Sequence, residues 1–228
     1  MRIKEQIREL ILSLGADVCG FAHVDSFDKA PSGFKPRDIF SDCQSIISFG
    51  MALPKGLAQI NPRLVYKHFN DMGIYMIDEL AFKAAKKIQA DFDCLTVPIP
   101  CDDPYEYWES DKMEGRGLLS MKHIAVAAGL GALGENTLLL NKRFGNMLTL
   151  GVILTDMNLP SDHVSQSICM DNCHKCVDNC PVGAIENGVV NQKLCRNHAY
   201  GKTKRGFNTT DCNLCRTICP MRYGDEYK

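Results

Sequence analysis

The sequence lacks long hydrophobic runs and carries almost no net charge. Its most apolar stretches, residues 124–133 and 147–155, are too short to span a bilayer. Residues 1–15 carry scattered charges, with neither the apolar core of a signal peptide nor a twin-arginine start. We therefore expect a cytoplasmic protein without a membrane partner. A formal net charge of −1 over 228 residues gives no general attraction for nucleic acid, so we expect no nucleic-acid partner either.

A dinucleotide-binding context is also missing, although its glycine motif is present. Gly129, Gly131 and Gly134 match the spacing G-x-G-x-x-G, which binds a dinucleotide when a strand precedes it and a helix follows it. Here the preceding residues favour a helix and the following residues favour a turn and a strand. The order is reversed, so no helix N-terminus is available for a phosphate. We expect no NAD or FAD at this loop, and a glycine-rich helix stop packed under a sheet is the simpler interpretation.

Hydrophobic periodicity predicts an α+β protein in two parts. Helices are predicted over residues 1–14, 61–91 and 116–128, and strands over 17–24, 45–53, 94–100 and 146–156. Pro98 favours the end of a strand or an edge strand, and the acidic and aromatic segment 101–114 favours a loop. After residue 158 the periodicity fades and turn residues dominate. We predict an α/β cofactor-binding domain over residues 1–157 and a small metal-organised domain over 158–228.

Twelve cysteines are the unusual feature of the composition. In a chain without an export signal they indicate metal or redox chemistry rather than disulfides. Four of them are scattered upstream and are expected to be small buried hydrophobic residues: Cys19, Cys43, Cys94 and Cys101. The other eight lie in the C-terminal part: Cys169, Cys173, Cys176, Cys180, Cys195, Cys212, Cys215 and Cys219.

The spacing of these eight cysteines is typical of bacterial ferredoxins. The first run is C-x3-C-x2-C-x3-C-P, and the second ends in C-x2-C-x3-C-P. In ferredoxins with two [4Fe–4S] clusters, the last cysteine of each run binds the cluster of the other run. That exchange predicts two sets of ligands: Cys169, Cys173, Cys176 and Cys219 for one cluster, and Cys180, Cys195, Cys212 and Cys215 for the other.

Structural zinc is the alternative, because paired C-x2-C motifs also form zinc ribbons. Zinc does not require the x3-C-P element, which occurs here twice, so the spacing favours iron–sulfur clusters. One departure concerns Cys169, which is separated from Cys173 by three residues where two are usual. If Cys169 is not a ligand, the first site is expected to hold a three-iron cluster.

Four stretches together resemble the epoxyqueuosine reductase family: AGLGALGENTLLLN, GNMLTLGVILTD, CHKCVDNCPVGAI and CNLCRTICP. The resemblance covers about residues 115–222. It implies a corrinoid-binding domain related in fold to flavin reductases, followed by a ferredoxin-like domain with two [4Fe–4S] clusters; reductive dehalogenases share this architecture. The cofactor is then cobalamin, or a flavin as the alternative. The residues that the resemblance assigns to the cofactor pocket are Gly129, Gly131, Gly134, Glu135, Asn136, Leu150, Gly151 and Thr155.

The sequence departs from this family at three places. Glu135 replaces the lysine that follows the third glycine, and Gly115 aligns with the proton-donating aspartate. The family also has a tRNA-binding region beyond its clusters, whereas this sequence stops at Lys228. We therefore expect a short paralogue that does not act on tRNA. Asp102 or Asp103 is a candidate for the missing proton donor, and a solvated acidic loop is the simpler interpretation of that segment.

Two functions remain open. The preferred one is an oxidoreductase that passes electrons through two clusters to a corrinoid or flavin, which reduces a small-molecule substrate. The alternative is an electron-transfer or activating protein that has no substrate and serves a redox partner protein. The basic and aromatic segment 200–207 is a candidate docking site for such a partner, although it equally suits a solvated loop. His123 is a candidate for the pocket, with a packed or surface histidine as the simpler interpretation.

Overall fold

The computed structural model describes residues 2–102 and 104–225, and it is built around one four-stranded antiparallel sheet. The strand order is β1–β2–β8–β3, with bounds Val18–His23, Ser45–Ala52, Leu148–Thr155 and Thr96–Ile99. β2 and β8 pair along their whole length, from Ser45 opposite Thr155 to Ala52 opposite Leu148. β3 is an edge strand and contains Pro98, as expected for a residue that cannot donate to a second neighbour.

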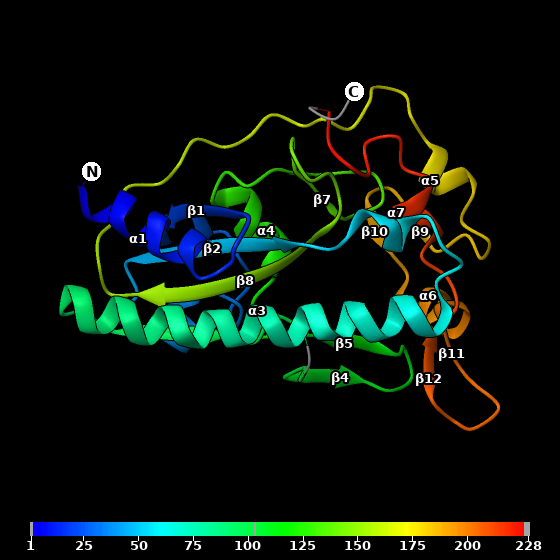
Figure 1. The fold of residues 1–228 in the computed structure, drawn as a ribbon, viewed down its shortest axis with the longest axis horizontal. Helices are drawn as coiled ribbons and strands as arrows, with labels where there is room; N and C mark the ends of the chain where they lie inside the picture. Colours follow the sequence, from blue (N-terminus) through cyan, green and yellow to red (C-terminus); the bar gives the residue numbers. More distant parts are fainter. Residues whose placement is uncertain (1, 103, 226–228) are drawn as a thin grey trace.

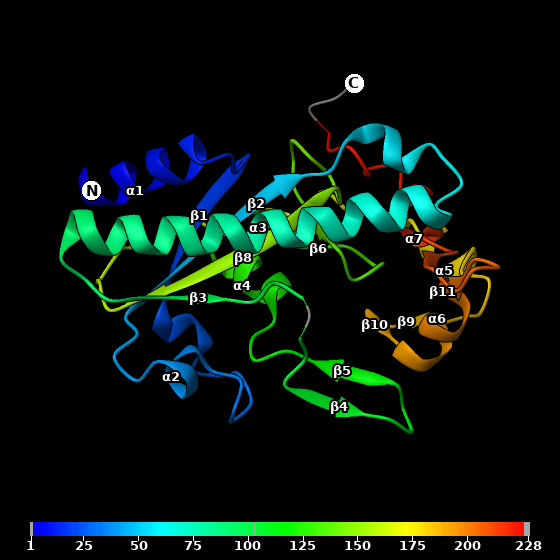
Figure 2. The same cartoon turned by 60° about the horizontal axis from the view of Figure 1, so that its bottom comes forward.

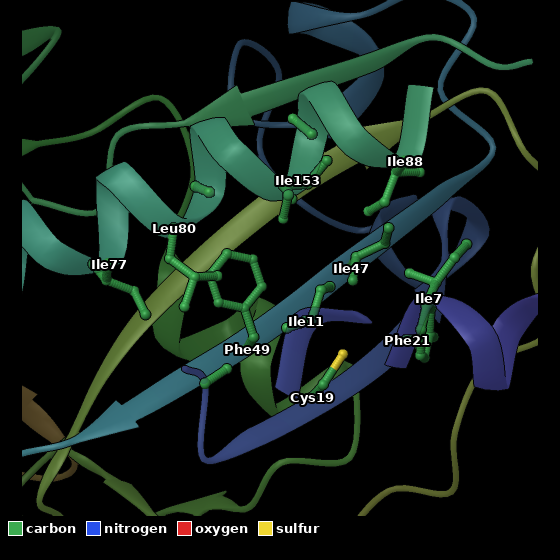
Figure 3. Packing of buried hydrophobic residues seen from close by; sticks show 14 of the residues in the cluster. Ile7, Ile11, Cys19, Phe21, Ile47, Phe49, Ile77, Leu80, Ile88 and Ile153 are labelled. Carbon is green, nitrogen blue, oxygen red and sulfur yellow. The ribbon is translucent and has the colours of Figure 1, made fainter. Parts of the chain in front are cut away.

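Helices cover both faces of this sheet (Figures 1 and 2). α1 (Arg2–Ser13) and the long α3 (Arg63–Phe92) lie on one face, and α4 (Met121–Ala127) lies on the other. Alternate strand residues therefore enter two cores. Ile47 and Phe49 pack toward α1 and α3 (Figure 3), and Ile46 packs on the opposite side of the sheet. Burial on both faces explains why these strands are continuous apolar runs in the sequence.

Short elements connect this framework. Two single 3-10 turns follow the first two strands at Val24–Phe27 and Lys55–Ala58, and α2 covers Pro36–Ile39. The hairpin β4–β5 pairs Tyr107–Glu109 with Glu114–Arg116, and β6–β7 pairs Ala132–Leu133 with Leu139–Leu140.

The part after β8 contains short elements only. They are α5 (Lys175–Asp178), β9 (Ile185–Glu186), β10 (Val189–Val190), α6 (Gln192–Ala199), β11 (Tyr200–Lys202), β12 (Asn208–Thr210) and α7 (Leu214–Thr217). Its buried apolar residues are few: Leu159, Cys176, Ala184, Ile185, Ala199 and Cys219. So small an apolar core indicates that this part depends on other interactions for its stability.

Two anchors join this part to the sheet. At the start of α3, Arg63 forms a β-bridge with Thr210 and an ion pair of 3.2 Å with Asp211. Along the segment that leaves β8, the Asp162 carboxylate accepts hydrogen bonds from both Nη2 of Arg8 (3.0 Å) and the Phe21 backbone N–H (3.0 Å), and it pairs with Lys4 (2.7 Å). Burial alone raises the pKa of Asp162, but the two cations outweigh it, so that pKa lies below its usual value.

The structure differs from the sequence-based expectation at two places. The segment 101–114, expected to be a loop, contributes β4 and the start of β5. The helix expected over 116–128 is shorter and begins only at Met121. None of the described helices combines the length and apolar character that crossing a membrane requires.

Candidate functional site

The first three cysteines of the first run lie together with the last cysteine of the second run, and all four line one small cavity. Burial raises the pKa of Cys176, and so do the nearby thiols of Cys219 and Cys169. Burial likewise raises the pKa of Cys219, with further contributions from Cys169 and Cys173. We call Cys169, Cys173, Cys176 and Cys219 group A. Cys169 belongs to this group although it lies one residue further from Cys173 than usual.

The additional residue is absorbed by a tight turn. The Cys173 N–H donates to the Met170 carbonyl at 3.2 Å, and Asn172 adopts a left-handed conformation with φ of 57°. Asparagine is one of the few residues other than glycine that adopts this conformation readily. The turn therefore brings Cys169 back toward the other thiols of group A.

The remaining four cysteines form a second set. Burial raises the pKa of Cys195, followed by the charges of Cys180 and Cys212. Burial raises the pKa of Cys215 to about 11, and the same three thiols contribute to it. We call Cys180, Cys195, Cys212 and Cys215 group B. Each group thus contains one cysteine from the other run, and the role of these thiols as ligands stays a prediction.

Both groups depend on short helices and backbone donors. Cys176 lies in α5 and Cys215 lies in α7, and these two helices contact each other. The Ala184 N–H donates to the Cys180 sulfur at 3.2 Å, a kind of bond that tunes the potential of an iron–sulfur cluster. Asn136 stands between the groups: it lines a small cavity beside group A, and its Nδ2 donates to the Cys215 carbonyl at 3.0 Å.

The thiols do not gather around a single point. Within the described ranges, no three His, Cys, Asp or Glu side chains form a group that could hold a metal ion. A single zinc ion needs thiolates about 3.8 Å apart, given a Zn–S bond of about 2.3 Å in a tetrahedron. A four-iron cube binds each thiolate through a different iron, which sets the thiolates further apart.

The glycine loop is packed rather than open. A Cβ at Gly129 would lie 2.4 Å from the His163 carbonyl oxygen, and one at Gly131 would lie 2.3 Å from the Leu140 carbonyl oxygen. Glycine is required here because another stretch of backbone approaches closely. Gly134 lies against the Leu140 side chain and, with Glu135 and Asn136, lines the small cavity beside group A.

The other residues assigned to the pocket lie inside the sheet. A Cβ at Gly151 would lie 2.5 Å from the Phe49 ring, and both Leu150 and Thr155 are buried. Four cavities border the cysteine groups, the β4–β5 hairpin and the start of α3. The glycine-loop and sheet residues that line none of these four are Gly129, Gly131, Leu150, Gly151 and Thr155.

Two of these cavities adjoin each other between the β4–β5 hairpin and α6, which face one another in Figure 2. Their volumes are about 690 and 590 Å³, and Val189, Val190 and Gln192 line both of them. Gln192 holds the hairpin in place, because its side-chain amide accepts from the Gly115 N–H (3.0 Å) and donates to the Gly115 carbonyl (3.1 Å). The smaller cavity also reaches Cys195 of group B.

Gly115, the position that the sequence resemblance aligns with a proton-donating aspartate, is closely packed. A Cβ there would lie 2.8 Å from the Tyr105 ring. The Tyr105 hydroxyl donates to Asp102 Oδ1 at 3.2 Å and accepts from Arg196 Nη2 at 3.0 Å. The Arg196 guanidinium packs over the rings of Tyr105 and Trp108, at 5.3 and 5.2 Å. The Tyr105 hydroxyl therefore lies between Arg196 and Asp102 and bonds to both.

Lys122 and His123 complete the smaller cavity. The Lys122 ammonium donates to the Thr137 carbonyl at 2.8 Å, and burial lowers its pKa. Burial, followed by the charge of Lys122, lowers the pKa of His123, whose Nδ1 lies 2.6 Å from the Ser120 hydroxyl. Burial raises the pKa of Tyr200, which also lines this cavity, to about 12.

Sequence analysis identified His123 and the aromatic segment 101–114 in this region but missed three residues: Lys122, Gln192 and Arg196. They come from separate segments that only the fold brings together, and the one available signal was the position of Arg196 directly after Cys195. Among the other candidates, Asp103 lies outside the described residues. Cys101 is half-buried, with its N–H bonded to Asp78 at 3.0 Å.

Comparison with known proteins finds relatives named epoxyqueuosine reductase. The chain is 24% identical to the epoxyqueuosine reductase of Bacillus subtilis over 99% of its own length and 65% of that protein, and 25% identical to that of Bacillus anthracis over 99% and 66%. It thus spans about two thirds of the relatives that it matches. No protein-family model matches the chain.

Solved structures show the same fold. An epoxyqueuosine reductase with an epoxyqueuosine-modified tRNA-Tyr stem loop superposes with a TM-score of 0.69 at 18% identity, covering 100% of this chain and 67% of the other. A catabolic reductive dehalogenase in complex with 3-bromo-4-hydroxybenzoic acid superposes with a TM-score of 0.72 at 17% identity. The match covers 97% of this chain and 32% of the dehalogenase. A further reductive dehalogenase structure is described as suggesting a mechanism for B12-dependent dehalogenation. The chain resembles epoxyqueuosine reductases along its length and shares its fold with both groups.

Proposed function

We propose that this protein is an iron–sulfur reductase in which two [4Fe–4S] clusters deliver electrons to a cofactor that reduces a small molecule. The observation that carries the proposal is the partition of eight thiols into two groups of four, with Cys180 and Cys219 exchanged between the runs. Zinc ribbons have no need of that exchange, whereas two-cluster ferredoxins use it. Similarity to proteins named as reductases supports the same conclusion.

The residues around the thiols suit clusters. Group A would hold one cluster and group B the other, with Asn136 hydrogen-bonded to the backbone between them. The Ala184 N–H would stabilise negative charge on the Cys180 sulfur. When bound, the clusters supply single-electron transfer; the protein fixes their positions and limits their contact with water.

A corrinoid fits the larger of the two adjoining cavities better than it fits the glycine loop. The volume of this cavity, about 690 Å³, lies in the upper part of the range of about 300–1,000 Å³ that ligand pockets cover. It would hold the cofactor, and the adjoining cavity of about 590 Å³, which shares Val189, Val190 and Gln192 with it, would leave room for a substrate beside Cys195. Such a cofactor supplies the bond chemistry, and a flavin is the alternative in the same place. The close backbone approaches at Gly129 and Gly131 leave no comparable space.

A small molecule is the substrate that these residues favour. Gly115 and the Tyr105 ring replace the carboxylate of the related tRNA-modifying enzymes, so the proton donor of that reaction is missing from its position. The net charge of −1 provides no broad surface attraction for tRNA.

Anaerobic purification tests the proposal. We expect about eight irons and eight sulfides per chain, with an electron paramagnetic resonance signal after reduction by dithionite. Cys215→Ser should lose iron, while the matched variant Cys94→Ser, outside both groups, should retain it. Fewer than about four irons in the reconstituted wild type would overturn the proposal.

Titration of the same samples with cobalamin and with flavin tests the second half. A spectral change on binding of either cofactor supports a reductase. Full clusters with no change for either cofactor would overturn the cofactor site and leave a protein that transfers electrons to a partner.

A further inference from the structure

The smaller of the two adjoining cavities, about 590 Å³, has an unbalanced charge. Among the described residues that line it, two carry a positive charge, Lys122 and Arg196, and none is acidic. His123 adds a neutral imidazole, because burial and the charge of Lys122 lower its pKa. The larger cavity beside it contains acidic and basic side chains together, such as Asp111, Glu114 and Lys193. In a protein of net charge −1, a cavity lined in this way is a local concentration of positive charge.

Neither strong cation in this cavity forms a direct ion pair, although the Asp102 carboxylate, behind Tyr105, contributes to the raised pKa of Arg196. The ion pairs formed between described residues include neither Lys122 nor Arg196. The Lys122 ammonium has three donors, and its hydrogen bonds within the described residues go to the neutral carbonyl and hydroxyl of Thr137. Arg196 bonds to the neutral side chains of Gln192 and Tyr105. Asp102 lies behind the Tyr105 hydroxyl and is not part of the cavity wall.

A partly buried ammonium without a counter-charge is costly, and a bound anion would offset that cost. The rest of the wall consists of the Tyr105 and Tyr200 rings and the apolar Val189 and Val190. Such a wall suits the carbon skeleton of an organic molecule better than it suits an inorganic ion.

We propose that this cavity binds the substrate through a carboxylate or phosphate group, held by Lys122 and Arg196, with the carbon skeleton against Val189, Val190 and the tyrosine rings. The substrate of the proposed reductase is therefore a small organic anion. This inference rests on the proposed function for the identity of the ligand as substrate, whereas the anion site itself is testable without catalysis.

Trp108 provides a direct readout of binding. It is the single tryptophan of the chain, and its ring lies 5.2 Å from the Arg196 guanidinium and 6.2 Å from the Tyr105 ring. The protein with its clusters is titrated with cyclohexanecarboxylate, with its neutral isostere cyclohexanecarboxamide, and with inorganic phosphate. None of these probes carries an aromatic ring, so tryptophan fluorescence can be followed throughout.

We expect cyclohexanecarboxylate or phosphate to bind saturably with a Kd below about 10 mM, and the amide to bind at least about tenfold more weakly. Saturation by the carboxylate alone, or by phosphate alone, identifies which anionic group the site prefers. Equal binding of acid and amide, or no saturation by either anion, would overturn the proposal. This comparison needs no variant.

Variants then locate the site. Lys122→Gln should weaken anion binding at least about tenfold, and Lys122→Arg should recover most of the affinity because it keeps the charge. Lys83→Gln removes the same charge from the exposed surface of α3, where Lys83 pairs with Glu79, and should leave the affinity within about twofold. Unchanged binding by Lys122→Gln would refute the role of Lys122.

Iron analysis of every sample separates the two proposals. Full iron content without anion binding refutes the anion site and leaves the iron–sulfur proposal intact. Low iron content in the wild type refutes the proposed function, and saturable binding by the same protein would still support the anion site.

Discussion

Paired cysteine variants test whether the ligands are exchanged between the two runs. Cys173→Ser with Cys219→Ser removes two thiols from group A, although these residues belong to different runs. Cys173→Ser with Cys180→Ser removes two thiols of the same run, one from each group. If clusters followed the order of the sequence, the second pair would damage a single cluster. The grouping of the thiols gives the opposite expectation.

The magnitudes follow from four irons per cluster. The pair within group A should lose about four of about eight irons, and the signal of the group B cluster should persist unchanged. The pair that spans both groups should leave no intact four-iron cluster, because each retains only three thiols, and three-iron signals should replace both. Iron and sulfide analysis together with electron paramagnetic resonance distinguishes the two results, with Cys94→Ser as the control. One undisturbed cluster in the variant that spans both groups would refute the exchange.

Three further predictions concern the framework and the cavity. Asp162→Asn should lower the free energy of unfolding, measured in urea, by about 2–3 kcal/mol. This is less than the roughly 3–5 kcal/mol for a fully buried ion pair, because the Asp162 carboxylate is partly exposed. An unchanged urea midpoint would refute the role of Asp162 in joining the two parts. Gly131→Ala should cost about 1–3 kcal/mol because its Cβ meets the Leu140 carbonyl, whereas Gly56→Ala, with open space around it, should be neutral in the same assay. Competitive labelling with acetic anhydride across a pH series should give Lys122 a pKa below its ordinary 10.5, since burial disfavours the ammonium; a pKa at or above that value would contradict it.

The sheet and its helices could be predicted because their signals are local. β2 is buried on both faces, and its eight residues are apolar or glycine except for Ser45 and Ser48. Pro98 predicted either the end of a strand or an edge strand, and the structure shows the edge. The two sets of thiols are likewise predicted by the x3-C-P spacing, because this signal is a short interval between cysteines in the sequence and does not depend on contacts made by the fold.

The β4–β5 hairpin had no such signal. Its Trp108 is 49% exposed, so no apolar periodicity marks β4. The hairpin is held largely from outside, by the Gln192 amide, which lies 77 residues along the chain from Gly115. A contact of that kind depends on the completed fold, and the cavity between β5 and α6 was therefore missed together with its charges.

The glycine loop shows a different limit. The motif correctly indicated a place where side chains are excluded, but it does not say what excludes them. At Gly129 and Gly131 the neighbouring atoms are backbone carbonyls of this same chain. A ligand and a second strand of backbone impose the same demand on a sequence, so the motif alone cannot distinguish them.

The long helix α3 has a consequence for electron delivery. Its 30 residues extend about 45 Å. Arg63, at its start, contacts Thr210 and Asp211, which directly precede Cys212. The C-terminal half of the helix packs on the sheet. Electron tunnelling slows exponentially as donor and acceptor separate, so a chain that carries electrons gains from fixed separations. In the proposed reductase, a continuous helix that runs along the sheet toward the cysteine-rich part (Figure 1) would keep such separations constant.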